Sequence, residues 1–332
     1  MRSHTQQGRF TRRAVLTGAL GAAGSLVFAG AAHASGKPGQ GNGHGNGGGH
    51  GRGRGRGHRQ CDPDVVATEP ISVAYVEVNN EDLINVGRYR LADGKQLFAI
   101  GIIFAANLNA STTTTSGTAL VCNERVQQTL DEAATQIRPL QAKGTKVLLS
   151  VLGNHQGVGL ANFQSFGAAD DFARQVATLV NRYGLDGVDL DDEYSDYGAN
   201  GSLQPNDSSI GWLITALRDR MPDKLITFYD IGPSSDSLRT ADPSIGAKLD
   251  HAWNPYYGAY NPPSIPGLGN DKNGAAAIDW QSTSASSAAA LATRTDTDGF
   301  GVYLTYNLDD VDRSAYANSF TQPLYGQDTV FS

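Results

Sequence analysis

The chain alternates between short apolar runs and longer segments with helical periodicity. Strands are predicted where apolar, β-branched and aromatic residues gather, at 71–78, 97–104, 146–152, 225–229, 251–254 and 300–306. Helices are predicted where apolar residues recur at helical spacing, at 123–143, 163–183, 209–220 and 283–295. Residues 255–282 show no regular pattern and are expected to form a long loop.

This alternation of strand and helix continues along roughly 260 residues, and it predicts a parallel sheet with right-handed crossovers. About eight strand candidates in this length favour an α/β fold, a closed (β/α)8 barrel of the TIM type in which some helices can be short or missing. An open doubly wound sheet is disfavoured, because no glycine-rich dinucleotide fingerprint follows the first strand. Functional side chains of such a barrel lie at the carboxyl ends of its strands.

One segment, residues 183–197, alternates apolar residues with carboxylates. Side chains two apart share a strand face, so Asp189, Asp191 and Glu193 project together while the apolar residues between them pack on the other side. Such a face costs stability, because the carboxylates repel one another and lose hydration when buried. The same arrangement suits a site that needs a protonated carboxyl, because a neighbouring negative charge raises the pKa of an acid. The alternatives are a solvated acidic turn or a calcium loop, although the glycine of an EF-hand loop is missing.

Charge is divided unevenly along the chain. Of 26 basic residues, 9 lie in the first 59 positions, which contain no acidic residue; this leaves 17 basic against 33 acidic residues from Gln60 onward. A body with this excess of negative charge repels phosphate backbones, so nucleic acid is not an expected partner of the folded part. A neutral ligand such as a sugar fits better.

The amino-terminal segments predict export. Residues 1–34 combine Arg12-Arg13, an apolar run and a final Ala32-His-Ala34, which is typical of a twin-arginine-like signal peptide. We therefore expect a secreted protein without a transmembrane segment. Residues 35–62, rich in Gly, Arg and His, are expected to be a disordered linker, with a cationic tether to anionic polymers as the alternative.

The remaining residues, 63–332, are expected to form the catalytic barrel, and a monomer is expected. Cys61 and Cys122 could form a disulfide in a secreted protein or remain two free thiols. Polar side chains end several predicted strands: Asn154, Glu193, Asn254, Tyr256 and Tyr306. Because the carboxyl ends of barrel strands meet at one rim, these residues should form a single site.

An acid beside other carboxylates suits cleavage of a glycosidic bond. Asp191 and Glu193 share one strand face, so both approach the sugar from the same side. A nucleophile must attack from the side opposite the leaving group, and the N-acetyl group of the substrate is the obvious supplier. The pattern therefore indicates a substrate-assisted glycosidase.

The carboxylate segment also resembles a known signature. Asp186-Gly-Val-Asp189-Leu-Asp191-Asp-Glu193 is similar to the Asp-x-x-Asp-x-Asp-x-Glu motif of glycoside hydrolase family 18. Residues 146–157, 250–258 and 301–308 resemble endo-β-N-acetylglucosaminidases of that family, of the endoglycosidase H type, and the resemblance covers about residues 70–326. It implies retaining hydrolysis of the GlcNAc-β1,4-GlcNAc bond in the chitobiose core of high-mannose and hybrid N-glycans. N-linked glycoproteins would be the substrates, and no metal or organic cofactor is implied.

The resemblance further implies roles for individual residues. Glu193 would act first as general acid and then as general base, and Asp191 would bind the acetamide N–H and stabilise an oxazolinium ion. Asp189 would set the protonation state of Asp191 through like-charge coupling. Tyr256, together with Asn254, would hold the acetamide against C1. The other substrate-binding candidates are Asn154, Tyr306 and Asp186, and Asp186 is equally open to a structural role.

Expectations for the neighbouring residues are more local. Asp192 is expected to face solvent, Trp253 to lie in the helix layer, and Trp280 to be the better candidate for stacking on a sugar. His155 could touch substrate or make a local hydrogen bond. A family 18 chitinase is the first alternative function, although three tryptophans in the whole chain are few for an open chitin cleft. A non-catalytic glycan-binding barrel is the second, and the presence of Glu193 argues against it.

Overall fold

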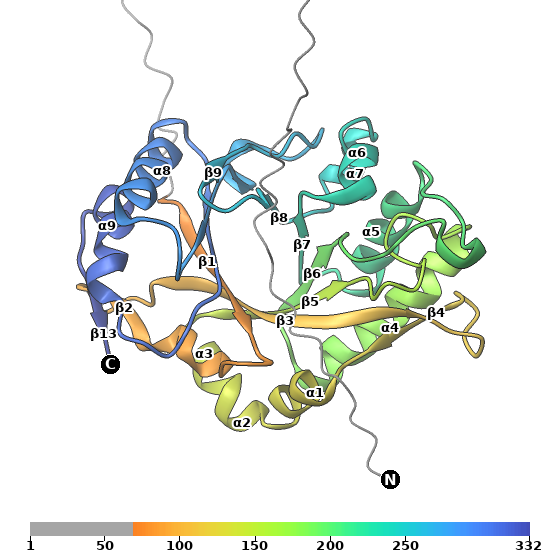
Figure 1. The fold of residues 1–332 in the computed structure, drawn as a ribbon, viewed down its shortest axis with the longest axis horizontal. Helices are drawn as coiled ribbons and strands as arrows, with labels where there is room; N and C mark the ends of the chain where they lie inside the picture. Colours follow the sequence, from red (N-terminus) through yellow and green to blue (C-terminus); the bar gives the residue numbers. More distant parts are fainter. Residues whose placement is uncertain (1–68) are drawn as a thin grey trace, which may run out of the picture. The chain divides into compact units, whose positions relative to one another are not determined.

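The computed structural model describes residues 69–332, drawn in colour in Figure 1. The predicted signal peptide, the predicted linker, its boundary with the barrel and Cys61 lie outside the described residues, and so does any pairing of Cys61 with Cys122.

Within residues 69–332, the central sheet has eight parallel strand positions (Figure 1). In order around the sheet they are β1 (Ile71–Glu77), β3 (Phe98–Ala110), β5 (Lys146–Leu152), β6 (Gly187–Asp191), β7 (Leu225–Tyr229), β8 (His251–Trp253), β10 with β11 (Asn273–Gly274 and Ala276–Asp279) and β12 (Val302–Tyr306). β10 pairs with β8, β11 pairs with β12, and β12 pairs with β1, so the split seventh position closes the ring. The predicted TIM-type barrel is confirmed.

The helices lie outside the strands and are uneven in length (Figure 1). They are α1 (Glu124–Asp131), α2 (Ala133–Gln136), α3 (Arg138–Ala142), α4 (Phe166–Tyr183), α5 (Ser209–Arg220), α6 (Gly232–Leu238), α7 (Pro243–Gly246), α8 (Ala285–Thr297) and α9 (Ser314–Tyr325). In the described part of the chain, the only helix between β1 and β3 is the 3-10 helix η1 (Leu83–Arg88), and the only helix between β8 and β10 is η3 (Asn270–Lys272). Short and missing helices are thus confirmed.

Two segments differ from the sequence-based expectation. The helix expected over 123–143 is broken into α1, α2 and α3, and Pro139 lies in the first turn of α3, where its missing N–H is tolerated. The loop expected over 255–282 contains β9 (Ala259–Tyr260), β10 and β11. These strands are two to four residues long and consist mainly of Ala, Gly and Asn, so they lack the β-branched run that marks the other strands.

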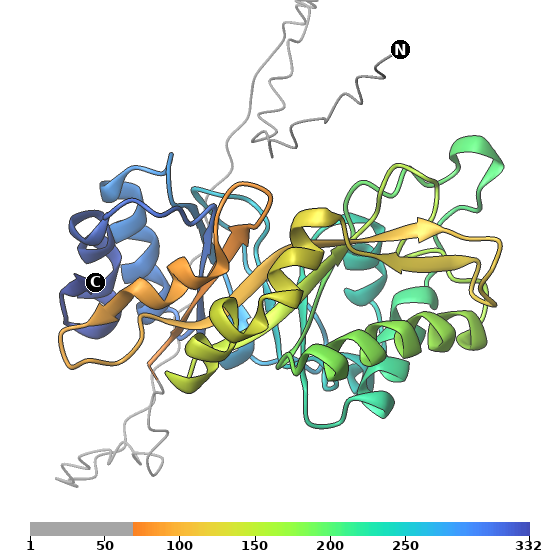
Figure 2. The same ribbon diagram turned by 90° about the horizontal axis from the view of Figure 1, so that it is seen from below.

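The strand β3 is longer than predicted, with 13 residues. Its second half pairs antiparallel with β4 (Thr118–Val121), and Figure 2 shows this hairpin, in yellow, running alongside the green helix α4. At the carboxyl end of the chain, β13 (Thr329–Phe331) pairs with β2 (Tyr89–Leu91). The backbone N–H of Ala110 in the β3–β4 hairpin donates to the Gln156 side chain at 2.9 Å, so the hairpin lies next to the loop that follows β5.

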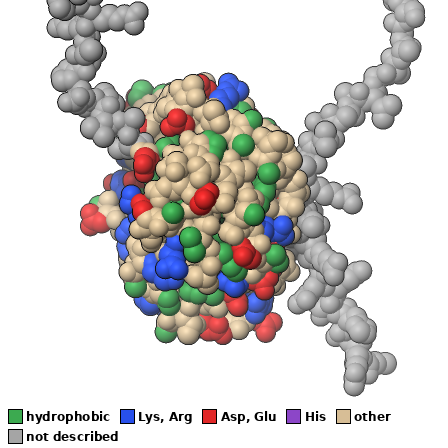
Figure 3. Space-filling model, turned by 90° about the vertical axis from the view of Figure 1, so that its left-hand side faces the viewer, with side chains coloured by type: hydrophobic (Ala, Val, Ile, Leu, Met, Phe, Trp, Pro, Cys, Tyr) green, Lys and Arg blue, Asp and Glu red, His purple; other side chains and the backbone are tan. Residues whose placement is uncertain are grey.

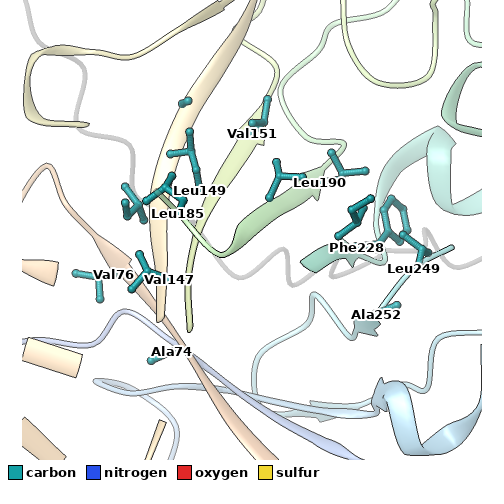
Figure 4. Packing of buried hydrophobic residues seen from close by; sticks show 14 of the residues in the cluster. Ala74, Val76, Val147, Leu149, Val151, Leu185, Leu190, Phe228, Leu249 and Ala252 are labelled. Atoms are coloured by element: carbon teal, nitrogen blue, oxygen red, sulfur yellow. The ribbon is translucent and has the colours of Figure 1, made fainter. Parts of the chain in front are cut away.

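Alternation along the strands separates two apolar cores. The outer core fills the space between sheet and helices and includes Val147, Leu149 and Leu190 (Figure 4). The inner core lies inside the barrel. Burying each such side chain contributes about 1.5–3 kcal/mol, and this packing fixes which residues of each strand can point inward.

The surface carries both signs of charge. On the face shown in Figure 3, acidic and basic side chains are intermixed and no basic tract is visible. None of the helices between residues 69 and 332 is long and apolar enough to cross a membrane.

Candidate active site

Alternate residues of the strands point into the barrel, and those nearest the carboxyl ends are polar or aromatic. They are Tyr75, Glu77, Ser150, Asp189, Asp191, Thr227, Tyr229, Trp253 and Tyr306. β6 thus presents Asp189 and Asp191 on the inner face, as the period-two argument predicted.

Asp189 is fully buried in the middle of the barrel. Its carboxylate accepts hydrogen bonds from the hydroxyls of Tyr75, Ser150 and Thr227, each at 2.8 Å. These three donors replace lost hydration and stabilise negative charge on the carboxylate. The site therefore has a fixed, hydrogen-bonded carboxylate below its rim.

Tyr75 connects Asp189 to the aromatic part of the inner core. Its hydroxyl donates to Asp189 and accepts the indole N–H of Trp253 at 2.8 Å. Burial, followed by the charges of Asp189, Tyr229 and Asp191, raises the pKa of Tyr75 well above its usual value, so it remains a neutral donor. The expected place of Trp253 in the helix layer is wrong: Ala252 faces outward, which turns Trp253 into the barrel.

Asp191 and Glu193 lie above Asp189. Asp191 is the last residue of β6, is fully buried, and pairs in register with Tyr229. Glu193 follows two residues later and is partly exposed. One carboxylate oxygen of each residue is buried. The structure thus places the three carboxylates in sequence from the barrel interior to its rim.

The loops after β5 and β6 are joined beside Glu193. Gly153 N–H donates to the carbonyl of Glu193 at 3.0 Å, and His155 N–H donates to the carbonyl of Tyr194. The His155 imidazole also contacts the Asp196 carboxylate at 2.9 Å, so its local hydrogen bond is present. His155, Tyr194 and Asp196 have φ values of 55°, 57° and 50°, in the left-handed region that side chains disfavour. Strained backbone therefore surrounds the proposed acid.

Asp192 does not face solvent, so this expectation is wrong. It is 4% exposed and accepts hydrogen bonds from the Tyr197 hydroxyl and, at 2.8 Å, from the Ser234 N–H. Burial raises the pKa of Asp192, against the lowering effect of these bonds. Asp192 connects the loop after β6 to the start of α6, a contact between distant segments that no local sequence pattern predicts.

Asn254 makes structural hydrogen bonds and does not face the site as expected. It is fully buried; its Nδ2 donates to the carbonyls of Ala259 and Ala275 at 2.9 and 3.0 Å, and its Oδ1 accepts the N–H of Tyr256 at 2.8 Å. These bonds occupy the amide that was expected to hold an acetamide. Asn254 instead fixes the turn after β8 against the break between β10 and β11.

The same turn directs Tyr256 toward solvent and its neighbour Tyr257 toward the barrel interior. Tyr256 is 52% exposed, whereas Tyr257 packs against the inner core. The hydroxyl of Tyr257 lies 2.7 Å from that of Tyr229, and its ring is stacked on Tyr306 with centroids 4.7 Å apart. The structure therefore favours Tyr257, which the sequence analysis missed, over Tyr256 as the tyrosine of the site.

Glu77 is a second residue that the sequence analysis missed. It ends β1, is 5% exposed, and accepts the hydroxyl hydrogen bond of Tyr306, which is itself 3% exposed. The signal was available: positions 73, 75 and 77 share a strand face, and a carboxylate at the carboxyl end of an inner barrel face marks a candidate site residue.

The last two candidates lie at opposite ends of the barrel. Asn154 follows β5 at the rim and donates to Asn109 of the β3–β4 hairpin at 2.9 Å. Asp186 precedes β6 and accepts hydrogen bonds from Gln141 and from Val147 N–H at 2.7 and 2.9 Å. At roughly 3.3 Å per strand residue, Asp186 is about 16 Å from Asp191. This position and these hydrogen bonds favour the structural alternative that the sequence analysis left open for Asp186.

Trp280 is buried and packs edge-on against Tyr89 and Phe98, so the expectation that it stacks on a sugar is also wrong. Trp212 lies on α5 and packs partly buried against the outer core. With Trp253 inside the barrel, all three tryptophans of the chain are placed, and none forms part of an open aromatic cleft.

Two known proteins with similar sequences are endo-β-N-acetylglucosaminidases. No protein-family model matches the chain. An endo-β-N-acetylglucosaminidase of Flavobacterium sp. (strain SK1022) is 61% identical over 262 residues, which cover 79% of this chain and 82% of that enzyme. Endo-β-N-acetylglucosaminidase F1 of Elizabethkingia meningoseptica is 31% identical over 273 residues, covering 78% and 79%.

Solved structures give the same result. Bacteroides thetaiotamicron EndoBT-3987 with a Man5GlcNAc product has a TM-score of 0.68 and 30% identity, over 79% of this chain and 62% of that longer chain. A family 18 chitinase from Pseudoalteromonas aurantia, at 15% identity and a TM-score of 0.52 over 76% of this chain and all of that one, shares the fold. The sequence relationship, the barrel and the carboxylate series at its rim converge: the chain belongs to the endo-β-N-acetylglucosaminidases of glycoside hydrolase family 18.

Proposed function

We propose that this enzyme hydrolyses the GlcNAc-β1,4-GlcNAc bond in the chitobiose core of high-mannose and hybrid N-glycans. One N-acetylglucosamine would remain on the asparagine of the glycoprotein. EndoBT-3987 supports this substrate class, since its structures contain a Man5GlcNAc product and a Man9GlcNAc2Asn substrate. The placement of the three tryptophans away from any open cleft supports it over a chitin chain.

The proposed reaction is retaining and uses the acetamide of the substrate as nucleophile. Glu193, at the rim, protonates the leaving glycosidic oxygen while the acetyl oxygen attacks C1. The C1–O bond breaks and an oxazolinium ion forms. Glu193, now ionised, then takes a proton from water, and the water oxygen attacks C1 to restore the N-acetyl group with retention.

The hydrogen-bonded burial of Asp189 directly below Asp191 carries this proposal. Negative charge on Asp189, stabilised by three hydroxyls, disfavours a second negative charge on Asp191, so the pair titrates as a set. The positive charge that develops on the oxazolinium ion favours the ionised form of Asp191, which can then orient the acetamide N–H and offset that charge. A barrel that only bound glycans would not need buried carboxylates arranged in this way.

Holding the acetamide oxygen against C1 is the second requirement, because intramolecular attack depends on orientation. We assign this role to Tyr257, on the wall formed by Tyr229 and Tyr306. Asn154 would contact the sugar from the side of the β3–β4 hairpin.

We also propose that the protein is secreted, through the twin-arginine-like leader at residues 1–34. Expression in a host with and without a functional twin-arginine pathway would test this. Extracellular enzyme that persists without the pathway would contradict it.

The function is tested by mass spectrometry of a native glycoprotein with high-mannose N-glycans after incubation with the enzyme. The expected product carries a single N-acetylglucosamine on asparagine, and Glu193→Gln protein serves as the control. An unchanged glycoprotein together with degraded chitin oligomers would overturn the proposal in favour of a chitinase. Binding of either glycan without any turnover would identify a glycan-binding barrel.

A further inference from the structure

We propose that Glu77 is a positioning residue of this site, which acts through Tyr306 on the wall that holds the substrate acetamide. The inference rests on the proposed function for the identity of the acetamide. It assigns Glu77 a task that the carboxylates Asp189, Asp191 and Glu193 do not perform.

Glu77 lies on the opposite side of the barrel mouth from these carboxylates. β1 and β6 are separated by β3 and β5 on one side of the ring and by β7, β8, β10–β11 and β12 on the other. Both strands end in a buried inner-face carboxylate, Glu77 on β1 and Asp191 on β6. The substrate sugar would therefore lie between Glu77 and Asp191.

A continuous series of contacts leads from Glu77 to the acetamide wall. The carboxylate accepts the hydrogen bond of the Tyr306 hydroxyl, and the Tyr306 ring is stacked on Tyr257 at an interplanar angle of 5°. The Tyr257 hydroxyl bonds to that of Tyr229, which in turn donates to the carbonyl of Pro255 at 2.9 Å. A shift of the Tyr306 ring would therefore move Tyr257 as well.

Tyr306 needs an external anchor, because the chain turns immediately after it. It is the last residue of β12, and Asn307 has a φ of 68°. β1 can supply this anchor, since it pairs in parallel with β12 up to Ala74 and Thr305, and Leu308 N–H donates to the carbonyl of Tyr75. Glu77 extends from the same strand and fixes the phenol end of the ring.

A passive packing role would not require a carboxylate. Burying one at 5% exposure is unfavourable, whereas phenylalanine at position 306 with an apolar residue at 77 would keep the ring stack without that cost. The pair is thus better explained by orientation of the ring than by stability.

The test uses three single variants and one double variant of the full-length enzyme. Tyr306→Phe removes the donor and keeps the ring, Glu77→Leu removes the acceptor at similar size, and Glu77→Gln keeps an acceptor oxygen. The double variant is Glu77→Leu with Tyr306→Phe. Each is assayed with a Man9GlcNAc2-asparagine peptide and with a preformed sugar oxazoline, which does not require attack by the acetyl oxygen.

Loss of the anchor should slow the step in which the acetyl oxygen attacks. Tyr306→Phe and Glu77→Leu should each lower kcat for the glycopeptide by about tenfold, the loss expected for one orienting hydrogen bond. Oxazoline hydrolysis should fall by less than about twofold, since that bond is already formed. The double variant should be no slower than either single variant, and Glu77→Gln should restore most of the activity.

Tyr303→Phe is the matched control, because Tyr303 lies on β12 and loses a buried hydrogen bond to Ala288 in the helix layer. It should leave both rates unchanged. Equal losses on glycopeptide and oxazoline, additive losses in the double variant, or wild-type kcat in Glu77→Leu would overturn the proposal. A wild-type enzyme that cleaves no glycopeptide would instead refute the proposed function, so the two failures are distinct.

Discussion

The backbone N–H of Gly153 donates to the carbonyl oxygen of Glu193 at 3.0 Å, so the end of β5 holds the main chain of the proposed acid. The contact is too close for any other residue. A Cβ at position 153 would lie 2.7 Å from that oxygen and 2.5 Å from Oγ of Ser195. Glycine at this position therefore sets the distance between two loops of the site.

Gly153→Ala should separate these loops and displace Glu193. A displacement of about 1 Å can cost on the order of 100-fold in rate, so kcat on a glycopeptide should fall by about 10- to 100-fold. Gly167→Ala is the control, because its Cβ would meet nothing closer than Ser165 Oγ at 3.8 Å. Wild-type kcat in Gly153→Ala would show that the loop contact does not position the acid.

Glu193→Gln should preserve the fold and abolish hydrolysis. The glutamine keeps the size of the side chain at this partly exposed rim position but cannot donate a proton to the leaving oxygen. General acid–base catalysis contributes roughly 10²–10⁴-fold, so kcat should fall at least about 100-fold with an unchanged Tm. Substantial turnover by the variant would remove Glu193 from the acid role.

Much of the fold could be predicted because most barrel strands carry a local signature. β3 and β5 are dense in Ile, Val and Leu, and a strand buried on both faces needs such residues. β10 and β11 escaped prediction because their short Ala- and Gly-containing segments are strands only through pairing with β8 and β12. This pairing depends on contacts with strands that are distant in the sequence, so a short stretch of sequence does not reveal it.

The residues of the site were likewise predictable where they lie on a paired strand and unpredictable where they lie beyond it. Asp189 and Asp191 were predicted correctly as inner-face residues because strand alternation is local. The choice between Tyr256 and Tyr257 depends on the turn that Asn254 fixes, and the burial of Asp192 depends on Ser234 at the start of α6. Side chains alternate between the two faces only within a paired strand, so the sequence alone could not place the residues that follow the last paired position.

Asp192 should make stability depend on pH. Burial raises the pKa of its carboxyl above the usual value, so the folded state binds the proton more tightly than the unfolded state. This contribution is full below the unfolded pKa, about 4, and is lost as pH rises through the raised folded pKa. In Asp192→Asn this loss is absent, because the amide does not titrate.

The free energy of unfolding of wild type minus that of Asp192→Asn should therefore decrease from about pH 4 toward neutrality. Urea unfolding at a series of pH values measures this difference. Asp223→Asn, at an exposed turn, is the control for general charge effects. A difference that stays constant with pH would contradict the assignment of the shifted group to Asp192.

Asp191→Asn should separate formation of the oxazolinium ion from its use. Asparagine can no longer offset the developing positive charge, so hydrolysis of a glycopeptide should fall by about 100-fold or more, the size of effect seen when a charge-stabilising group is removed from a site. A preformed sugar oxazoline bypasses that step, and Glu193 remains to activate an incoming acceptor hydroxyl. The variant should therefore transfer a sugar from the oxazoline to a GlcNAc-asparagine peptide, and the product should accumulate because its hydrolysis is slow.

Mass spectrometry of the peptide measures both hydrolysis and transfer. The control is the double variant Asp191→Asn/Glu193→Gln, which should catalyse neither reaction. Complete inertness of a folded Asp191→Asn toward the oxazoline would count against the substrate-assisted mechanism, since an enzyme with a carboxylate nucleophile has no reason to accept that donor.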